Sequence, residues 1–546
     1  MEMVTTALLL LLAVVVSGSL SRASRVPIPL PLVQIALGAV IASVADLGVV
    51  LKPDIFFLLF LPPLLFLDGW RIPKEGLFRD KGTILELAFG LVLLTVIGVG
   101  FFINWLIPAM PLAVAFALAA IVSPTDPIAV SAIAARVPIP KRLMHILEGE
   151  SLLNDASGLV CMRFAVVAAL TGTFSLVEAF GSFLWLAIGG IAIGIAVTWG
   201  VTWSKNWVSR RLGEETGSQI LISLLIPFGA YLIAEHLHCS GILAAVAAGI
   251  SMSYAEQSGQ ALPITRVRRN AVWETVQFAA NGTIFVLLGE QLPNIIAGAA
   301  QVVRDTGHHE PAWLLLYVVA INFALAALRF LWVWVSLRFT MFRAARKGEE
   351  FKRPGWRLIA ATTLAGVRGA ITLAGILTLP LVMNDGSPFP ARDLAIFLAA
   401  GVIILSLIAA SVGLPLLLRG LELPPEPSHQ EEEDKARNAA SEAAIHAIEL
   451  LQHDLGAGRP DADIYADVGA RIMELYRDRI DGRSKTGDEA QRLRKLEGID
   501  RELRLAGLRA ERDEIYRLGR SRRLSDDLVR KLVREVDLTE ARLLVV

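Results

Sequence analysis

An acidic motif opens one of the apolar stretches of this chain. Residues 150–155 read Glu-Ser-Leu-Leu-Asn-Asp, and the stretch that they open is long enough to cross a bilayer. Ionisable side chains at membrane depth are costly to insert, so they usually face a bundle interior and line an ion or proton path. On a helix, Ser151 and Asp155 share a face, whereas Glu150 lies about 140° around the helix from Asp155. The Asp155 carboxylate and the Ser151 hydroxyl therefore suit a cation, and Glu150 needs a separate counter-charge.

A second carboxylate lies between two prolines. Residues 123–127 read Ser-Pro-Thr-Asp-Pro. Each proline lacks an N–H and clashes with the carbonyl four residues earlier, so helix continuity should fail at about residues 120–123. Unwound backbone at membrane depth is tolerated only where protein or a water-filled cavity satisfies it, and half-helix ends there can meet a cation. We therefore expect Asp126 to share a cation with Asp155, with a simple proline kink as the alternative.

An arginine between glycines offers the missing counter-charge. Residues 366–369 read Gly-Val-Arg-Gly, and the glycines loosen the helix on either side of the arginine. Arg368 keeps its charge and must be paired within the membrane. We predict a structural salt bridge between Glu150 and Arg368, which leaves Asp126 and Asp155 as the titratable pair.

Other polar side chains lie in the apolar stretches. Asn281 is a candidate for lining an ion path. Glu274, Gln277, Arg163 and Arg329 are expected either to line the path or to pair with one another, and structural pairing is the favoured reading.

The composition places these residues in a membrane protein. The chain has 546 residues, of which 54% are hydrophobic and 19% charged, and this is too apolar for a soluble protein of its length.

Lys and Arg gather in alternate loops, which predicts an outside N-terminus and a cytoplasmic C-terminus. The fifth and twelfth spans are predicted to be broken and to run in opposite directions, as in inverted repeats, although no residue-level repeat supports this. About thirteen apolar runs are found, at about 3–20, 28–48, 53–70, 82–107, 111–136, 142–171, 177–204, 217–237, 240–256, 270–299, 312–343, 356–382 and 392–419.

A change of composition near residue 420 predicts two domains. Roughly 53 charged side chains lie in residues 1–420 and about 51 in residues 421–546. A proline-rich, acidic segment follows Leu423, and the sequence beyond it has helical spacing without a membrane-length apolar run. We predict a transmembrane domain over 1–420 and a cytoplasmic helical domain, for regulation or assembly, over 421–546.

Three motifs together resemble the monovalent cation:proton antiporter 1 family of sodium/proton exchangers, and most of all its bacterial branch. They are residues 123–127, 149–155 and 366–369, and the resemblance covers about 1–420. The family pattern implies an all-α polytopic protein with two broken, crossing helices. It also implies a homodimer in which a six-helix core moves like an elevator against a dimerisation domain.

The resemblance also implies a role for each matching residue. It makes Asp155 the principal ion- and proton-binding acid and places Glu150 and Arg368 in an interhelical salt bridge. Asn154 replaces a second acid that electrogenic relatives carry, which implies electroneutral one-for-one exchange. The remaining cation ligands that it implies are Asp126, Ser151 and the backbone carbonyl of Thr125.

These features predict a secondary active antiporter that exchanges Na⁺ for H⁺ across the cytoplasmic membrane, for pH and sodium homeostasis. Burial favours the neutral form of a carboxylate and a bound cation favours its charged form, so the two ions exclude each other from Asp155. We expect a monovalent cation, a proton, the bilayer and a second copy of the chain as partners. No cofactor, enzymatic activity or nucleic acid is expected.

Several alternatives remain open from the sequence. K⁺ or Li⁺ could replace Na⁺, because the oxygen ligands would be the same. A cation channel would need only rings of acids or carbonyls. In a sodium-coupled symporter for an organic acid, Arg368 would bind the substrate carboxylate, and its neutralisation by Glu150 would argue against this. The C-terminal domain could also be a ligand sensor on a membrane anchor.

Overall fold

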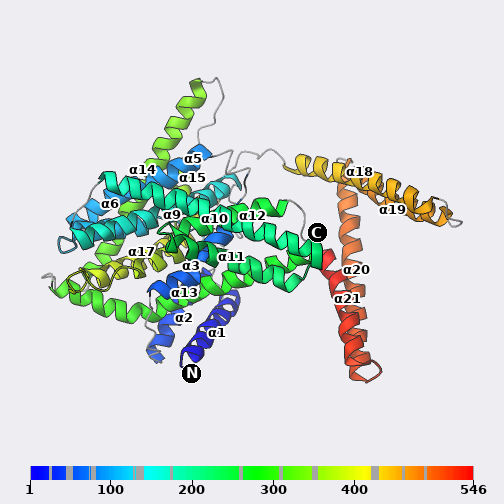
Figure 1. Ribbon diagram of the computed structural model, residues 1–546, viewed down its shortest axis with the longest axis horizontal. Coiled ribbons are helices and arrows are strands. Elements are labelled where there is room, and N and C mark those ends of the chain that lie inside the picture. Colours follow the sequence, from blue (N-terminus) through cyan, green and yellow to red (C-terminus); the bar gives the residue numbers. More distant parts are fainter. Residues whose placement is uncertain are drawn as a thin grey trace. The chain divides into compact units, whose positions relative to one another are not determined.

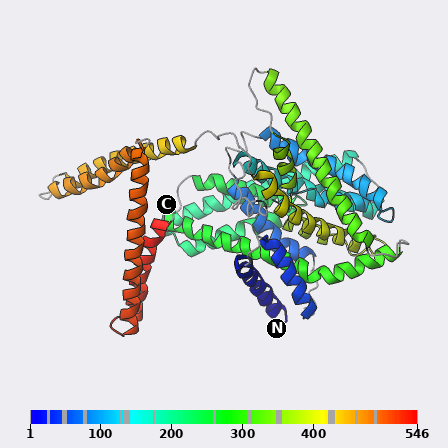
Figure 2. The same ribbon diagram turned by 180° about the vertical axis from the view of Figure 1, so that it is seen from behind.

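The computed structural model is almost entirely helical in the residues that it describes, with no strand among them. The chain divides into two compact units, Met1–Leu421 and Glu422–Val546, and Figures 1 and 2 show their helices as ribbons. The described residues are 2–23, 28–44, 53–72, 74, 81–126, 130, 141–172, 176–257, 262–305, 312–346, 355–419, 429–457, 462–484 and 488–544.

The first unit holds the apolar helices. Each apolar run predicted from the sequence overlaps one or more of them, although residues 127–129 and 131–136 of the run at 111–136 lie outside the described residues. Of the described helices, 8 are long and apolar enough to cross a membrane, and α2, α7 and α12 are shorter apolar helices. The total of about thirteen crossings stays a prediction. The helices are α1 (Glu2–Ala23), α2 (Leu30–Val44), α3 (Pro53–Arg71), α5 (Lys81–Leu85), η1 (Glu86–Leu91), α6 (Val92–Leu106), α7 (Leu112–Val122), α9 (Lys141–Thr171), α10 (Leu176–Leu212), α11 (Thr216–His236), α12 (Gly241–Gln257), α13 (Pro263–Asp305), α14 (Ala312–Arg346), α15 (Trp356–Leu364), α16 (Ala370–Leu377) and α17 (Arg392–Leu418).

These helices pack as two groups. One group contains α1, α2, α3 and α10 to α13, and the other contains α5, η1, α6, α7, α9 and α14 to α17. Contacts between the groups are made chiefly by α3 and α13 on one side and by α9, α16 and α17 on the other. The polar residues identified in α9 and α13 therefore belong to helices at the boundary between the two groups.

Glycines let helices of the first group approach closely. A Cβ atom at Gly69 of α3 would overlap the carbonyl of Val246 in α12, and one at Gly249 of α12 would overlap the carbonyl of Phe66 in α3. Lipid tails are as apolar as leucine, so helix pairs in a membrane gain stability from close van der Waals contact rather than from the hydrophobic effect. The α3–α12 pair thus depends on two residues that have no side chain.

The second unit consists of two helical hairpins. α18 (His429–Gly456) packs against α19 (Ala462–Ser484), and α20 (Asp488–Arg520) packs against α21 (Asp526–Leu544). A small apolar cluster that includes Ile515, Val533 and Val536 joins α20 to α21. Arg512 of α20 forms an ion pair of 2.8 Å with Asp537 of α21. The regulatory or assembly role of this unit stays a prediction.

We predict that Gly249→Ala destabilises the first unit. The new methyl group must push α3 and α12 apart, and overpacking of this kind costs about 1–3 kcal/mol. Gly200→Ala in α10 is the matched control, because a Cβ atom there would meet open space. Alanine otherwise favours a helix over glycine, so thermal unfolding in detergent should show a lower Tm for Gly249→Ala than for Gly200→Ala. Equal melting temperatures would contradict this account of the α3–α12 contact.

Candidate functional site

Two interrupted helices cross inside the first unit. Residues 123–126, which follow α7, and residues 365–369, between α15 and α16, are unwound. The amide of Asp126 donates a hydrogen bond to the carbonyl of Val367 at 2.7 Å. The two unwound segments thus satisfy part of each other's backbone, as lipid-embedded protein requires. The break predicted beside the glycines is confirmed, and so is the end of the helix that the prolines predicted at about residues 120–123. Residues 127–129 and 131–140 lie outside the described residues.

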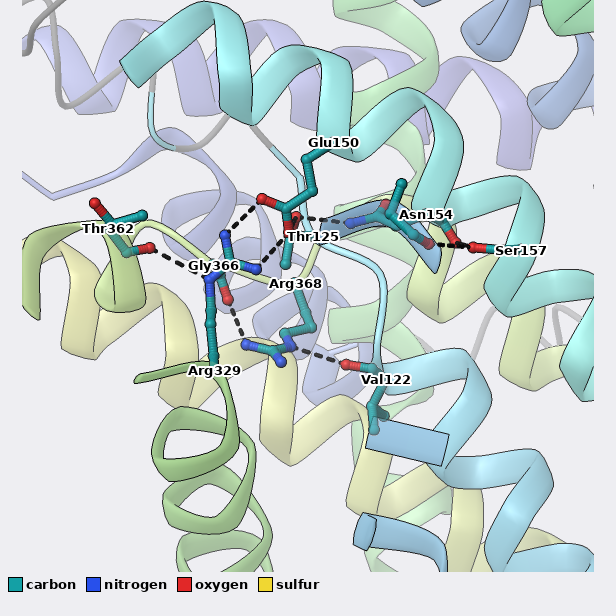
Figure 3. A network of polar contacts seen from close by, with 10 residues as sticks. Val122, Thr125, Glu150, Asn154, Ser157, Arg329, Thr362, Gly366 and Arg368 are labelled. Carbon is teal, nitrogen blue, oxygen red and sulfur yellow. Dashed lines mark hydrogen bonds and ion pairs between the residues drawn. The ribbon is translucent and has the colours of Figure 1, made fainter. Parts of the chain in front are cut away.

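Arg368 joins the ends of the interrupted helices. Its Nε donates to the carbonyl of Val122, the last residue of α7, at 2.9 Å, and its Nη1 donates to the carbonyl of Gly366 (Figure 3). Its own amide donates to the Ser406 hydroxyl at 3.2 Å. The ends of α7 and α15 leave carbonyls without intrahelical partners, and the helix dipole favours positive charge there. Arg368 therefore works as a shared cap for two half-helices.

Glu150 pairs with Arg329 of α14, so the predicted Glu150–Arg368 bridge is wrong. Arg329 donates through Nη2 to one carboxylate oxygen of Glu150 at 2.8 Å and through Nη1 to the other. Both side chains are buried, with 1% of Glu150 and 3% of Arg329 exposed. The prediction failed because carbonyls freed by the helix breaks take up Arg368, and a sequence does not display such acceptors.

Thr125 and Asn154 tie α9 to the unwound segment after α7. The side-chain amide of Asn154 donates to the Thr125 hydroxyl at 3.0 Å, and that hydroxyl donates to Glu150 at 3.4 Å. Three residues beyond Asn154, the Ser157 hydroxyl donates to the carbonyl of Ala88 in the π-helix η1 at 2.8 Å. The polar face of α9 is thus held by bonds to three other elements, and Figure 3 shows this network beside the Arg329 pair.

A small cavity brings the predicted cation ligands together. Its volume is about 20 Å³, which is room for roughly one water molecule or one small cation without its water shell. Asp155 and Ser151 line it from α9, as their four-residue spacing predicted, and Asn281 lines it from α13. The described lining residues are Leu64, Asp68, Pro124, Thr125, Asp126, Ser151, Asp155, Asn281, Gly369, Ala370, Ile371 and Thr372.

A larger cavity, the vestibule, adjoins the small one. Its volume is about 470 Å³, and Asp68, Ser151 and Asn281 line both cavities. It is lined by the end of α3, the first turns of α2, the first part of α9 and the middle of α13. The shared residues are polar, so the wall between the vestibule and the small cavity is polar. The other polar residues that line the vestibule are Gln34, Arg71, Glu148, Glu274 and Gln277.

Asp68 is the site residue that the sequence analysis missed. It lies on α3, three residues before the helix ends, and its carboxylate is the third that lines the small cavity, with Asp126 and Asp155. An acid inside the apolar run at about 53–70 was a sufficient signal, because ionisable residues in a span are functional candidates by default. The prolines that interrupt this run drew attention to its boundaries and away from Asp68.

The donor set suits a cation held by mixed oxygen ligands. In the part of the chain that the structure describes, no three His, Cys, Asp or Glu side chains are clustered tightly enough to hold a metal ion by themselves. Neutral oxygens such as the Ser151 hydroxyl must therefore complete any coordination of a cation. Arg368 lines neither cavity. Its guanidinium therefore binds backbone carbonyls and is not exposed to a ligand in either cavity.

Residues 9–420 match the family described as sodium/hydrogen exchanger, transmembrane. The chain belongs to this family. It is therefore a multi-pass membrane protein of the cation/proton antiporter class, which agrees with the apolar helices and with the resemblance noted in the sequence.

Similar proteins extend this comparison. A Na⁺/H⁺ exchanger of Escherichia coli, YjcE, is 42% identical over 549 residues, which covers 100% of this chain and 99% of that protein. A sodium, potassium, lithium and rubidium/H⁺ antiporter of Bacillus pumilus is 43% identical over 414 residues, or 75% of this chain and 61% of the relative. The solved sodium proton antiporter MjNhaP1 of Methanocaldococcus jannaschii has the same fold, with a TM-score of 0.58 and 20% identity over 77% of this chain and 99% of its own.

We predict that Glu150→Gln lowers the stability of the protein strongly. It leaves Arg329 buried without a counter-charge, and breaking a buried pair in this way typically costs about 3–5 kcal/mol. Glu148→Gln removes the same charge two residues away, where the side chain borders the vestibule. Thermal unfolding in detergent should show a large loss of Tm for Glu150→Gln and a small one for Glu148→Gln. Similar losses for both would contradict the structural role of the Glu150–Arg329 pair.

Proposed function

We propose that the protein exchanges one Na⁺ for one H⁺ across the cytoplasmic membrane without net charge movement, and so contributes to pH and sodium homeostasis. The observation that carries this is the small cavity, which Asp68, Asp126 and Asp155 line together with Ser151. The protein acts as a homodimer with its N-terminus outside and its C-terminus in the cytoplasm. It needs no cofactor and performs no enzymatic step. In this orientation the vestibule opens toward the cytoplasm.

The exchange follows from competition for one carboxylate. Asp155 binds either a cation or a proton, because burial favours its neutral form and a nearby cation favours its charged form. Asp126, Ser151 and the Thr125 carbonyl complete the cation shell, and Asp68 joins them from the other helix group. Since Asp68 lies on α3 and Asp155 on α9, a cation held between them touches both groups of helices.

Coupling requires that the empty, charged site does not move. A bare carboxylate is costly to carry past an apolar barrier, whereas a carboxylate neutralised by a cation or a proton is not. Relative movement of the two helix groups then exposes the loaded site to each side in turn. Asn154 supports electroneutral exchange, because this neutral side chain donates to Thr125 and adds no further titratable group beside Asp155.

K⁺/H⁺ exchange is the nearest alternative, and the printed name of the Bacillus relative, with four cations, is the observation that favours it. A symporter for an organic acid is less well supported. Neutralisation of Arg368 by Glu150 would have argued against a symporter. In the structure Glu150 pairs with Arg329 instead. Arg368 nevertheless has carbonyl partners and borders neither cavity, which leaves no place at Arg368 for a substrate carboxylate.

We predict that Asp155→Asn abolishes exchange while the protein still inserts and folds. The amide holds neither a transported proton nor the charge that attracts a cation. The measurement is the internal pH of liposomes that contain the purified protein and a pH dye, under gradients of Na⁺, K⁺ or Li⁺ and with the voltage clamped. In the wild type, a Na⁺ gradient should drive a pH change that does not depend on voltage.

Asp385→Asn is the matched control, because it makes the same substitution in an exposed loop between α16 and α17. It should exchange ions at the wild-type rate. Wild-type transport by Asp155→Asn would rule out the proposed role of Asp155. If none of the three cations caused proton movement in the wild type, a channel or a symporter would instead be favoured.

A further inference from the structure

The vestibule contains one positive charge in a path for cations. Its described lining includes the acids Asp68, Glu148 and Glu274, and its single basic side chain among those described residues is Arg71. Arg71 follows Asp68 by three residues on α3, so the two side chains share a face of that helix. Residues at this spacing are neighbours that form ion pairs readily.

Two residues of α13 hold Arg71 in its present position. Its Nη1 donates to the side-chain oxygen of Gln277 at 2.8 Å, and its Nη2 lies 3.9 Å from a carboxylate oxygen of Glu274. Glu274 and Gln277 are three residues apart and present their polar groups to the same cavity, with Asn281 four residues further toward the small cavity. The guanidinium is therefore directed toward α13, although a change of rotamer would bring it to the acid on its own helix.

A guanidinium at Asp68 would occupy the entrance to the cation site. Asp68 lines both cavities, so a cation from the vestibule must pass it or bind it. Arg71 carries the same charge as the transported ion and cannot leave, which would make it a permanent competitor for the acid. Arginine also prefers carboxylate partners with which it forms two parallel hydrogen bonds.

We propose that Gln277 and Glu274 are positioning residues that keep Arg71 away from Asp68 and so set the affinity for cation on the vestibule side. This proposal rests on the proposed function, since it concerns access to the same site. Gln277 acts as the main acceptor, because its bond is the shorter of the two. Arg71 is thus a positive side chain beside the cation site, and its bonds to α13 keep it from pairing with Asp68.

Gln277→Ala tests this proposal, because it removes the acceptor and changes no charge. In everted membrane vesicles, which present the cytoplasmic face to the added cation, we expect KM for Na⁺ to rise about three- to tenfold. This is the range expected for the loss of one hydrogen bond of ordinary net strength at a water-exposed site. The maximal rate should stay close to that of the wild type, since a competitor is displaced at high Na⁺. Gln277→Glu keeps an acceptor oxygen and should not raise KM.

The decisive variant is Gln277→Ala combined with Arg71→Gln. If Arg71 is the competitor, its removal returns KM to the wild-type value. A KM that stays raised in the double variant would overturn the proposal and show that Gln277 itself serves the cation path. An unchanged KM in Gln277→Ala would overturn it as well. Wild-type vesicles are measured first, so a failure of exchange there counts against the proposed function and is separate from these outcomes.

Discussion

The arrangement depends on two stretches of unwound backbone at membrane depth, each of which must find hydrogen-bond partners inside the protein. Every unsatisfied amide or carbonyl in hydrocarbon costs several kcal/mol, so unwound segments are tolerated only where protein or water meets them. Here the segments satisfy each other directly, through the Asp126 amide and the Val367 carbonyl. Arg368 takes two of the remaining carbonyls. Because the crossing is fixed in this way, Asp126 is held at the wall of the small cavity.

The charged residues near the crossing have two distinct tasks. Glu150, Arg329 and Arg368 are buried, and their partners are one another, backbone carbonyls or hydroxyls of the protein, so they fix helices relative to the crossing. Asp68 and Asp155 instead line the cavity and are available to a small ion. A buried ion pair contributes little net stability but is expensive to break, which suits a fixed support better than a mobile part. The paired structural charges are therefore separate from the acids that we propose to bind the ion.

The helix end before Asp126 and the common face of Ser151 and Asp155 could be predicted from the sequence, because both depend on local rules. Prolines on both sides of Asp126 end a helix wherever they occur, and the four-residue spacing of Ser151 and Asp155 places both on one face. The partner of Arg368 could not be predicted in the same way. Its acceptors are carbonyls that become free only when two distant helices are interrupted and cross, and the residue list shows only carboxylates as candidates. Asp68 was within reach of the sequence, since the rule that marks acids in spans applies to it fully.

The central claim is that a cation and a proton compete for Asp155. The most direct test is the release of protons when Na⁺ is added to purified protein in weakly buffered detergent solution, followed with a pH dye and with the amount of bound cation measured in parallel. The account predicts one proton released for each cation bound by the wild type, and neither release nor binding for Asp155→Asn. Cation binding to the wild type without proton release would contradict it.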